Sequence, residues 1–118
     1  MPSPVVTLLQ SLIRIPSVNP DCSPDGDGET AMADYVQEYL EKIGYSVTQE
    51  EVLPNRPNLI ARAPGPKDRP RILLGPHLDT VSVAGMDMDT FGTISDDGRI
   101  LGRGASDTKG PMAAMLLA

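Results

Sequence analysis

The stretch RILLGPHLDTV, residues 71–81, decides the fold that we expect for this chain. Residues 71–75 form a short apolar run, which is typical of a strand buried on both faces of a sheet. His77, the only histidine, follows this run after Pro76, and Asp79 comes two residues later. In an extended chain the side chains of residues i and i+2 point to the same face. The stretch therefore predicts a buried strand with an imidazole and a carboxylate at its carboxyl end, where open α/β sheets tend to place active sites.

Hydrophobic periodicity predicts helices and further strands around this strand. Helical spacing of apolar residues, with proline and glycine stop signals, predicts helices over 4–15, 27–43 and 109–118. Alternation and turn residues predict strands over 45–53 and 58–62, joined by a turn at 55–57, and a hairpin turn at 96–98. Helices alternating with strands indicate an α/β fold.

Composition excludes several classes of protein. The 118 residues fit one small domain, and a net charge of −6 leaves no basic stripe for a nucleic acid. Cys22 is the only cysteine, so neither a disulfide framework nor a cysteine-based zinc site is expected. No run is long enough to cross a membrane, and the start lacks the basic residues of a signal peptide. We therefore expect a cytoplasmic protein that binds neither nucleic acid nor membrane.

The pair His77 and Asp79 has two interpretations. A lone histidine is usually structural, and H-x-D alone is a weak motif. Alternatively, the Asp79 carboxylate accepts a hydrogen bond from the imidazole, which fixes its tautomer, as carboxylates do behind metal-bound histidines.

A second constellation is GRGASDTKG, residues 102–110. One interpretation is a tight turn with Asp107 as a helix N-cap. A phosphate-binding loop is excluded because Asp107 stands where the dinucleotide fingerprint needs a glycine, and Lys109 lacks the preceding glycine of a P-loop. Three glycines around an aspartate indicate a backbone that approaches something closely while presenting a carboxylate. A divalent cation fits, and the two oxygens of Asp107 could each bind one ion.

Together these stretches resemble the paired metal motifs of the M20 metallopeptidases. This family includes acetylornithine deacetylase, succinyl-diaminopimelate desuccinylase, aminoacylases and glutamate carboxypeptidase-type enzymes. The residues that carry the resemblance are 73–81 and 102–110, with 12–18 similar to the first-helix signature and 58–61 to the second strand. The resemblance runs the length of the chain, and the two metal motifs are specific only as a pair.

The resemblance implies a mixed-sheet, zinc-peptidase-like α/β sandwich, of which residues 1–118 are the amino-terminal part of the catalytic domain, without the dimerisation domain. It implies that His77 binds one Zn²⁺, that Asp107 bridges two Zn²⁺, and that Asp79 is the catalytic residue that holds the His77 ring. Co²⁺ is an alternative metal. It also implies a cis peptide bond after Asp107. The activity implied is hydrolysis of N-acyl amino acids or peptides, with acetylornithine deacetylase-like deacylation first, by a homodimer in the complete enzyme.

Three departures from the family pattern stand beside this resemblance. Pro76 precedes His77 where the family more often has Gly, Ser or Ala, and residues 84–91 replace a usual Trp and Asp-Pro-Phe pattern. The downstream Glu-Glu pair, a further acidic ligand and a late histidine have no counterpart in these 118 residues, and the last helix lacks an ending signal. The alternative is therefore a catalytically inactive fragment, or a subunit that requires the missing carboxyl-terminal portion.

A calcium loop is a weaker candidate. Its acids would be Asp21, Asp25, Asp27 and Glu29, but the spacing of an EF-hand and its distal glutamate are absent. Roles in loops and helix caps are the competing interpretation.

Overall fold

The computed structural model describes every residue of the chain except Asp96. In chain order the elements are α1 (Pro4–Ile13), α2 (Thr30–Lys42), β1 (Ser46–Leu53), β2 (Arg56–Arg62), β3 (Thr93–Ile94), β4 (Ile100–Leu101), the wide helical turn η1 (Ala105–Lys109) and α3 (Gly110–Leu117). None of the helices described is both long and apolar enough to cross a membrane.

The first two helices are slightly shorter than their sequence patterns predict. Helix α1 ends at Ile13, two residues before the predicted end. Helix α2 begins at Thr30 rather than near residue 27, because Gly28 has a φ of 74° and Glu29 is the N-cap. Gly44, with a φ of 95°, follows α2 in the left-handed conformation that ends many helices, as the sequence predicts.

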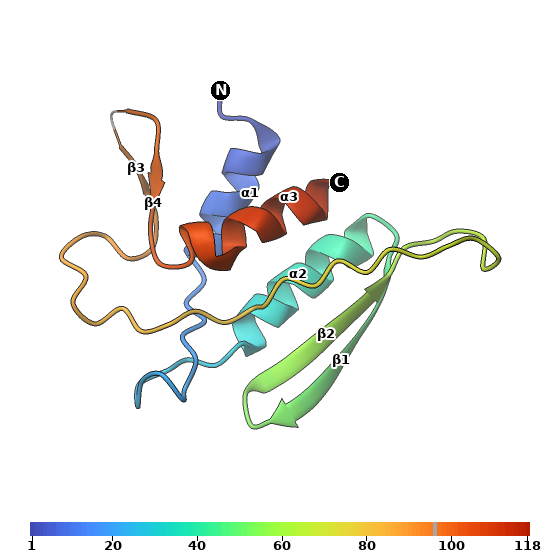
Figure 1. Cartoon of the computed structure of the whole chain (residues 1–118), viewed down its shortest axis with the longest axis horizontal. Helices are drawn as coiled ribbons and strands as arrows, with labels where there is room; N and C mark the ends of the chain where they lie inside the picture. Colours follow the sequence, from blue (N-terminus) through green and yellow to red (C-terminus); the bar gives the residue numbers. More distant parts are fainter. Residues whose placement is uncertain (96) are drawn as a thin grey trace.

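Strands β1 and β2 form an antiparallel hairpin in which Ser46 lies opposite Arg62. Helix α2 runs along this hairpin (Figure 1). The predicted turn at 55–57 lies slightly earlier, at 54–55, because Arg56 and Pro57 already belong to β2. Asn55 has a φ of 61° and supplies the left-handed conformation, which asparagine tolerates, so the chain reverses before Arg56.

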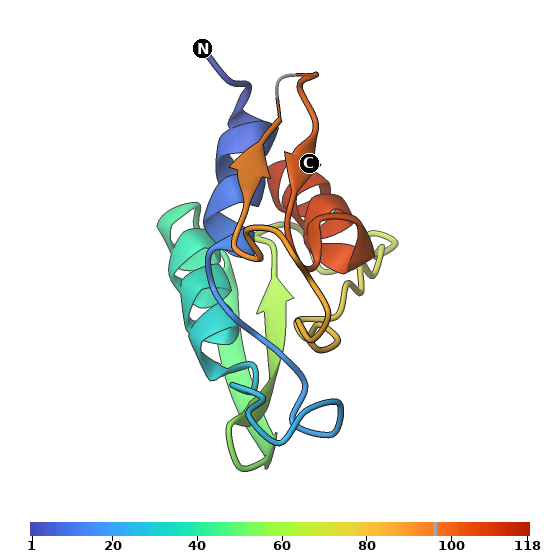
Figure 2. The ribbon, with the colours of Figure 1, turned by 90° about the vertical axis from the view of Figure 1, so that its left-hand side faces the viewer.

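The three helices enclose an aliphatic core. Helices α1 and α3 lie side by side beyond the end of α2 (Figure 2). The buried cluster comprises Leu8, Leu12, Met32, Val36, Leu40, Met112 and Ala113. This agrees with a sequence that has one Phe, three Tyr and no Trp.

The predicted strand at 71–75 does not form. The stretch crosses the molecule as an extended trace that joins no sheet (Figure 1), and Ile72 and Leu73 are 89% and 93% exposed. A cleft of about 930 Å³ separates residues 72–79 from β2. A strand is stable when its backbone N–H and C=O groups bond to a neighbouring strand. On the far side of this cleft, β2 pairs with β1 and not with residues 71–75.

The described residues form two separate antiparallel pairs, β1–β2 and β3–β4. In the second pair Ile94 lies opposite Ile100. This places a hairpin where the sequence predicts one, although Asp96 of its predicted turn lies outside the described residues. The chain is a small α/β domain, and the mixed-sheet sandwich stays a prediction.

Candidate metal centre

The segment that carries His77 is held by the loop after α1. Val18 forms a parallel bridge with Thr80. The Asn19 N–H donates to the Thr80 carbonyl at 2.8 Å, and the Thr80 N–H donates to the Ser17 carbonyl at 2.9 Å. The Ser17 hydroxyl, in a residue only 1% exposed, donates to the Leu78 carbonyl at 2.8 Å. These bonds position the backbone on both sides of Asp79.

The same loop holds the segment that carries Asp107. Lys109 is only 2% exposed, and its Nζ donates to the Ile15 carbonyl at 2.7 Å. Burial, only partly offset by the charge of Asp27, lowers the pKa of Lys109 to about 8. Residues 15–19 therefore contact both segments of the site directly.

Gly104 allows these two segments to meet closely. Its φ is 83°, and a Cβ there would lie 2.8 Å from Thr80 Cγ2 and 3.2 Å from Lys109 Cδ. The close approach that the sequence predicts for this glycine is therefore an approach to Thr80 and Lys109, and any larger residue would push the two segments apart.

His77 and Asp107 lie in direct contact although they are 30 residues apart. His77 Nε2 is 2.9 Å from Asp107 Oδ1, and the two side chains are 51% and 86% exposed. The peptide bond between Asp107 and Thr108 is cis, as the family resemblance implies. The N-cap position of α3 is Lys109, with no side-chain capping bond, so the interpretation of Asp107 as a simple N-cap is wrong.

Asp79 lies on the other side of the imidazole. His77 Nδ1 is 3.1 Å from Asp79 Oδ1 and 3.0 Å from the Asp79 carbonyl oxygen. Both oxygens are acceptors, so Nδ1 carries the proton and donates it. Asn19 Nδ2 donates to Asp79 Oδ2 at 2.9 Å. The contact between ring and carboxylate is the one that the sequence spacing predicts.

These neighbours change the affinity of His77 for protons. Partial burial lowers the pKa of His77, but the hydrogen bond with Asp107 outweighs it, together with the backbone contact and charge of Asp79. The net effect raises the pKa above its usual value, because acceptor oxygens face both ring nitrogens.

The donor set suits a divalent cation in part. Without a metal, the 2.9 Å contact requires a proton on Nε2, which it donates to Asp107 Oδ1. A cation would take the place of that proton: with the Nδ1 proton held by Asp79, Nε2 of the neutral ring would offer its lone pair to the ion. Nitrogen and carboxylate oxygen are both zinc ligands. Among the described residues no group of three or more His, Cys, Asp or Glu side chains could hold a metal ion. The chain thus offers two donors, and a four-coordinate ion needs others.

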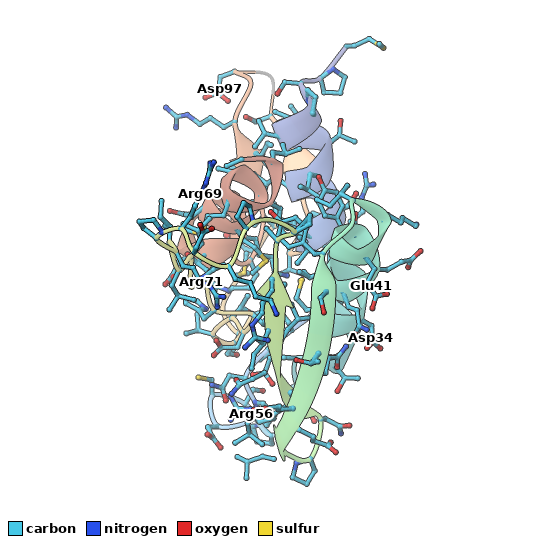
Figure 3. All side chains as sticks on the ribbon, turned by 90° about the vertical axis from the view of Figure 1, so that its right-hand side faces the viewer. Asp34, Glu41, Arg56, Arg69, Arg71 and Asp97 are labelled. Carbon is cyan, nitrogen blue, oxygen red and sulfur yellow. The ribbon has the colours of Figure 1, made fainter. Side chains whose placement is uncertain are left out.

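The acidic loop at 21–29 has a different role from the candidate calcium site. Arg56 pairs with Asp21 at 3.0 Å and with Glu29 at 2.9 Å. In Figure 3 Arg56 lies near the turn of the β1–β2 hairpin, at the opposite end of the molecule from Asp97. These two acids tie the loop to the hairpin, which agrees with a structural role.

Three residues that contact the site have no counterpart among the sequence-predicted site residues: Ser17, Asn19 and Lys109. Their partners are 61, 60 and 94 residues away in the chain. No local spacing connects residues so far apart, although Asn19 stands directly after the signature at 12–18.

Comparison with known proteins identifies a class of hydrolases. The N-formyl-4-amino-5-aminomethyl-2-methylpyrimidine deformylase of Halalkalibacterium halodurans is 30% identical over 119 residues, which cover 97% of this chain and 27% of that protein. The succinyl-diaminopimelate desuccinylase of Rhodospirillum centenum is 36% identical over 124 residues, covering 99% and 30%. An uncharacterized metallohydrolase of Methanocaldococcus jannaschii is 33% identical over 129 residues, covering 95% and 30%. No family model matches the chain.

The chain therefore spans less than a third of the length of these relatives. Over nearly all of its own length it is similar to hydrolases of the deacylase and metallohydrolase type. This supports the resemblance to M20-like hydrolases that the two motifs indicate, and one of these relatives is itself named a metallohydrolase.

Proposed function

We propose that this chain forms part of a metal-dependent hydrolase of amide bonds in N-acyl amino acids or peptides. The observation that carries the proposal is the contact of His77 Nε2 with Asp107 Oδ1 at 2.9 Å, which joins the two motifs. Acetylornithine deacetylase-like deacylation is the reaction that we expect first. The proposed cofactor is Zn²⁺, two ions in a complete site, with Co²⁺ as the alternative.

In this proposal His77 and Asp107 bind the metal, and Asp79 orients the imidazole. A metal held by these residues would supply Lewis-acid chemistry, polarising the amide carbonyl and lowering the pKa of a water molecule. Asp79 keeps the His77 proton on Nδ1, so that Nε2 offers its lone pair to the ion. The base that would take a proton from water is the downstream glutamate implied by the family resemblance.

Metal binding tests the two donors directly. We expect Zn²⁺ or Co²⁺ to bind the chain, and His77→Ala to lose about one metal equivalent in the complete site. Asp97→Asn is the control, because Asp97 is an exposed acid bonded to Arg99 and Ser95. Titration with Co²⁺, followed by absorption and by metal analysis, measures both variants. Full occupancy in His77→Ala would remove His77 from the centre.

Hydrolysis tests the substrate class. N-acetylornithine is the first substrate, and N-succinyl-diaminopimelate and an N-formyl amine represent the acyl groups in the names of the relatives. Release of the free amine should require metal, stop after removal by a chelator and return on addition of Zn²⁺. Release that persists in metal-free protein would contradict the proposal.

The second candidate is a catalytically inactive fragment, or a subunit that needs further chain. It is favoured by the two donors, since zinc usually takes four ligands, and by the exposed apolar residues at 72–74. The coding sequence after Ala118 separates the candidates. A continuation with a Glu-Glu pair and a late histidine supports the enzyme, whereas a stop codon and no partner chain support the fragment.

A further inference from the structure

Asn19 uses both ends of its side-chain amide. Nδ2 donates to Asp79 Oδ2 at 2.9 Å, and Oδ1 accepts the backbone N–H of Asp21 at 2.8 Å. The bond from Asp21 requires an acceptor, so it identifies the amide oxygen and leaves the nitrogen facing Asp79. The orientation of Asn19 is therefore fixed by its neighbours on both sides.

The backbone of Asn19 is anchored as well. Its N–H donates to the Thr80 carbonyl at 2.8 Å, and its own carbonyl accepts the N–H of Cys22 at 2.9 Å. Asn19 thus contacts the segment of the metal centre through both main chain and side chain.

The Asp79 carboxylate divides its two oxygens between two partners. Oδ2 accepts from Asn19 at 2.9 Å, and Oδ1 is 3.1 Å from His77 Nδ1. The terminal torsion of an aspartate has a broad energy profile, so a carboxylate without such a partner can turn its plane away from the ring. The bond from Asn19 opposes that rotation.

We propose that Asn19 is a positioning residue of the proposed metal centre: it holds Asp79 Oδ2, keeps Oδ1 on His77 Nδ1, and so keeps Nε2 directed toward Asp107, the other proposed ligand. This inference rests on the proposed function. The uncharged amide suits the task, because it orients the carboxylate without forming the ion pair that a lysine or arginine would make. Asp79 keeps its negative charge for the imidazole, which strengthens the hydrogen bond to the ring.

Asn19→Asp is the informative variant. It keeps an oxygen to accept the Asp21 N–H, but it removes the donor and places a second carboxylate against Asp79. Asp21→Ala is the matched control, because it removes the contact with Arg56 in the same loop and leaves the Asn19 side chain in place. Unfolding by urea establishes that each variant is folded.

Two measurements use the only histidine of the chain, whose ring signals belong to one residue. In metal-free protein, we expect the Nδ1 proton of His77 to exchange with water faster in Asn19→Asp than in the wild type or Asp21→Ala. In a titration with Co²⁺ alone, we expect the Asn19→Asp variant to bind Co²⁺ about tenfold more weakly than the wild type. This is the lower end of the losses seen when residues that hydrogen-bond metal ligands are changed.

A double-mutant cycle separates positioning from general loop stability. If Asn19 acts through Asp79, Asn19→Asp should have little further effect on Co²⁺ binding in an Asp79→Ala background. The same loss in both backgrounds would overturn the inference, as would unchanged proton exchange and unchanged affinity in the single variant. Wild-type His77 signals that do not respond to Co²⁺ would refute the metal centre itself, and proton exchange would still decide whether Asn19 orients the ring.

Discussion

The two ends of the segment from residue 71 to residue 80 differ sharply although they are one continuous extended stretch. At the first end Ile72 and Leu73 are about nine-tenths exposed and join no sheet. At the second end Thr80 is 3% exposed and exchanges backbone hydrogen bonds with Ser17 and Asn19. The apolar end is exposed and unpaired, whereas the end that carries the polar site residues is held by hydrogen bonds.

The difference shows that the end of the segment with a backbone hydrogen-bonding partner is held in place, whatever its residue types. Backbone groups must be paired wherever they are buried, and the loop at 15–19 offers that pairing at one end only. The site is therefore held by the loop at 15–19, which is distant in sequence, because the strand predicted at 71–75 does not form.

The largest effect should come from the core that supports the anchored end. Leu12 is fully buried in α1, the helix that leads into the loop, whereas Leu73 is 93% exposed. We expect Leu12→Ala to cost about 2–5 kcal/mol and Leu73→Ala less than about 0.5 kcal/mol, because only the first leaves a cavity. Urea unfolding followed by circular dichroism measures the free energy of unfolding of both variants. Equal losses would contradict the difference between the buried core and the exposed segment.

A smaller loss is expected from the carboxylate behind the ring. Asp79→Asn should keep metal binding but weaken it by about 10–100-fold, as changes in partners of metal ligands do. The control is Asp87→Asn, a change of the same type in the loop that follows the segment. Competition with a chromogenic chelator reports the affinities, and an unchanged value for Asp79→Asn would remove Asp79 from the centre.

Removing one hydroxyl tests the anchor itself. Ser17→Ala leaves the Leu78 carbonyl without its donor, so we expect a loss of about 1–3 kcal/mol in the free energy of unfolding. Ser11 also donates its hydroxyl to a carbonyl, that of Thr7, but in an exposed position. Ser11→Ala should therefore change stability by less than about 0.5 kcal/mol. Comparable urea midpoints for the two variants would contradict the role given to Ser17.

The smallest effect on stability is expected at the exposed, unpaired end of the segment, at Ile72. Ile72→Lys should change the free energy of unfolding by less than about 0.5 kcal/mol, because the residue has few contacts to lose. It should nevertheless reduce self-association, since exposed apolar chain with unpaired backbone favours association. Sedimentation velocity over a range of concentrations tests this. A large loss of stability would mean that the segment is packed in solution.

Sequence periodicity predicts the elements whose contacts are local. Helix α1, helix α2 and the β1–β2 hairpin follow from apolar spacing and turn residues. The contact of His77 with Asp79 follows from alternation along an extended chain. The contact of His77 with Asp107 follows only from the two motifs taken together with the family resemblance.

What the sequence could not predict depends on distant partners. The run at 71–75 has the composition of a buried strand, but no described strand pairs with it. The contacts of Ser17, Asn19 and Lys109 join residues that are 60 or more positions apart. No local pattern specifies such contacts.

The ion pairs of Arg56 have a consequence for the cost of binding a cation. They hold the acidic loop at 21–29 against the hairpin, while the backbone of Asn19, just before that loop, is hydrogen-bonded to Thr80. A loop restrained at both sides has lost much of its conformational freedom already on folding. An arriving ion then orders little additional chain, and more of its interaction energy remains as affinity.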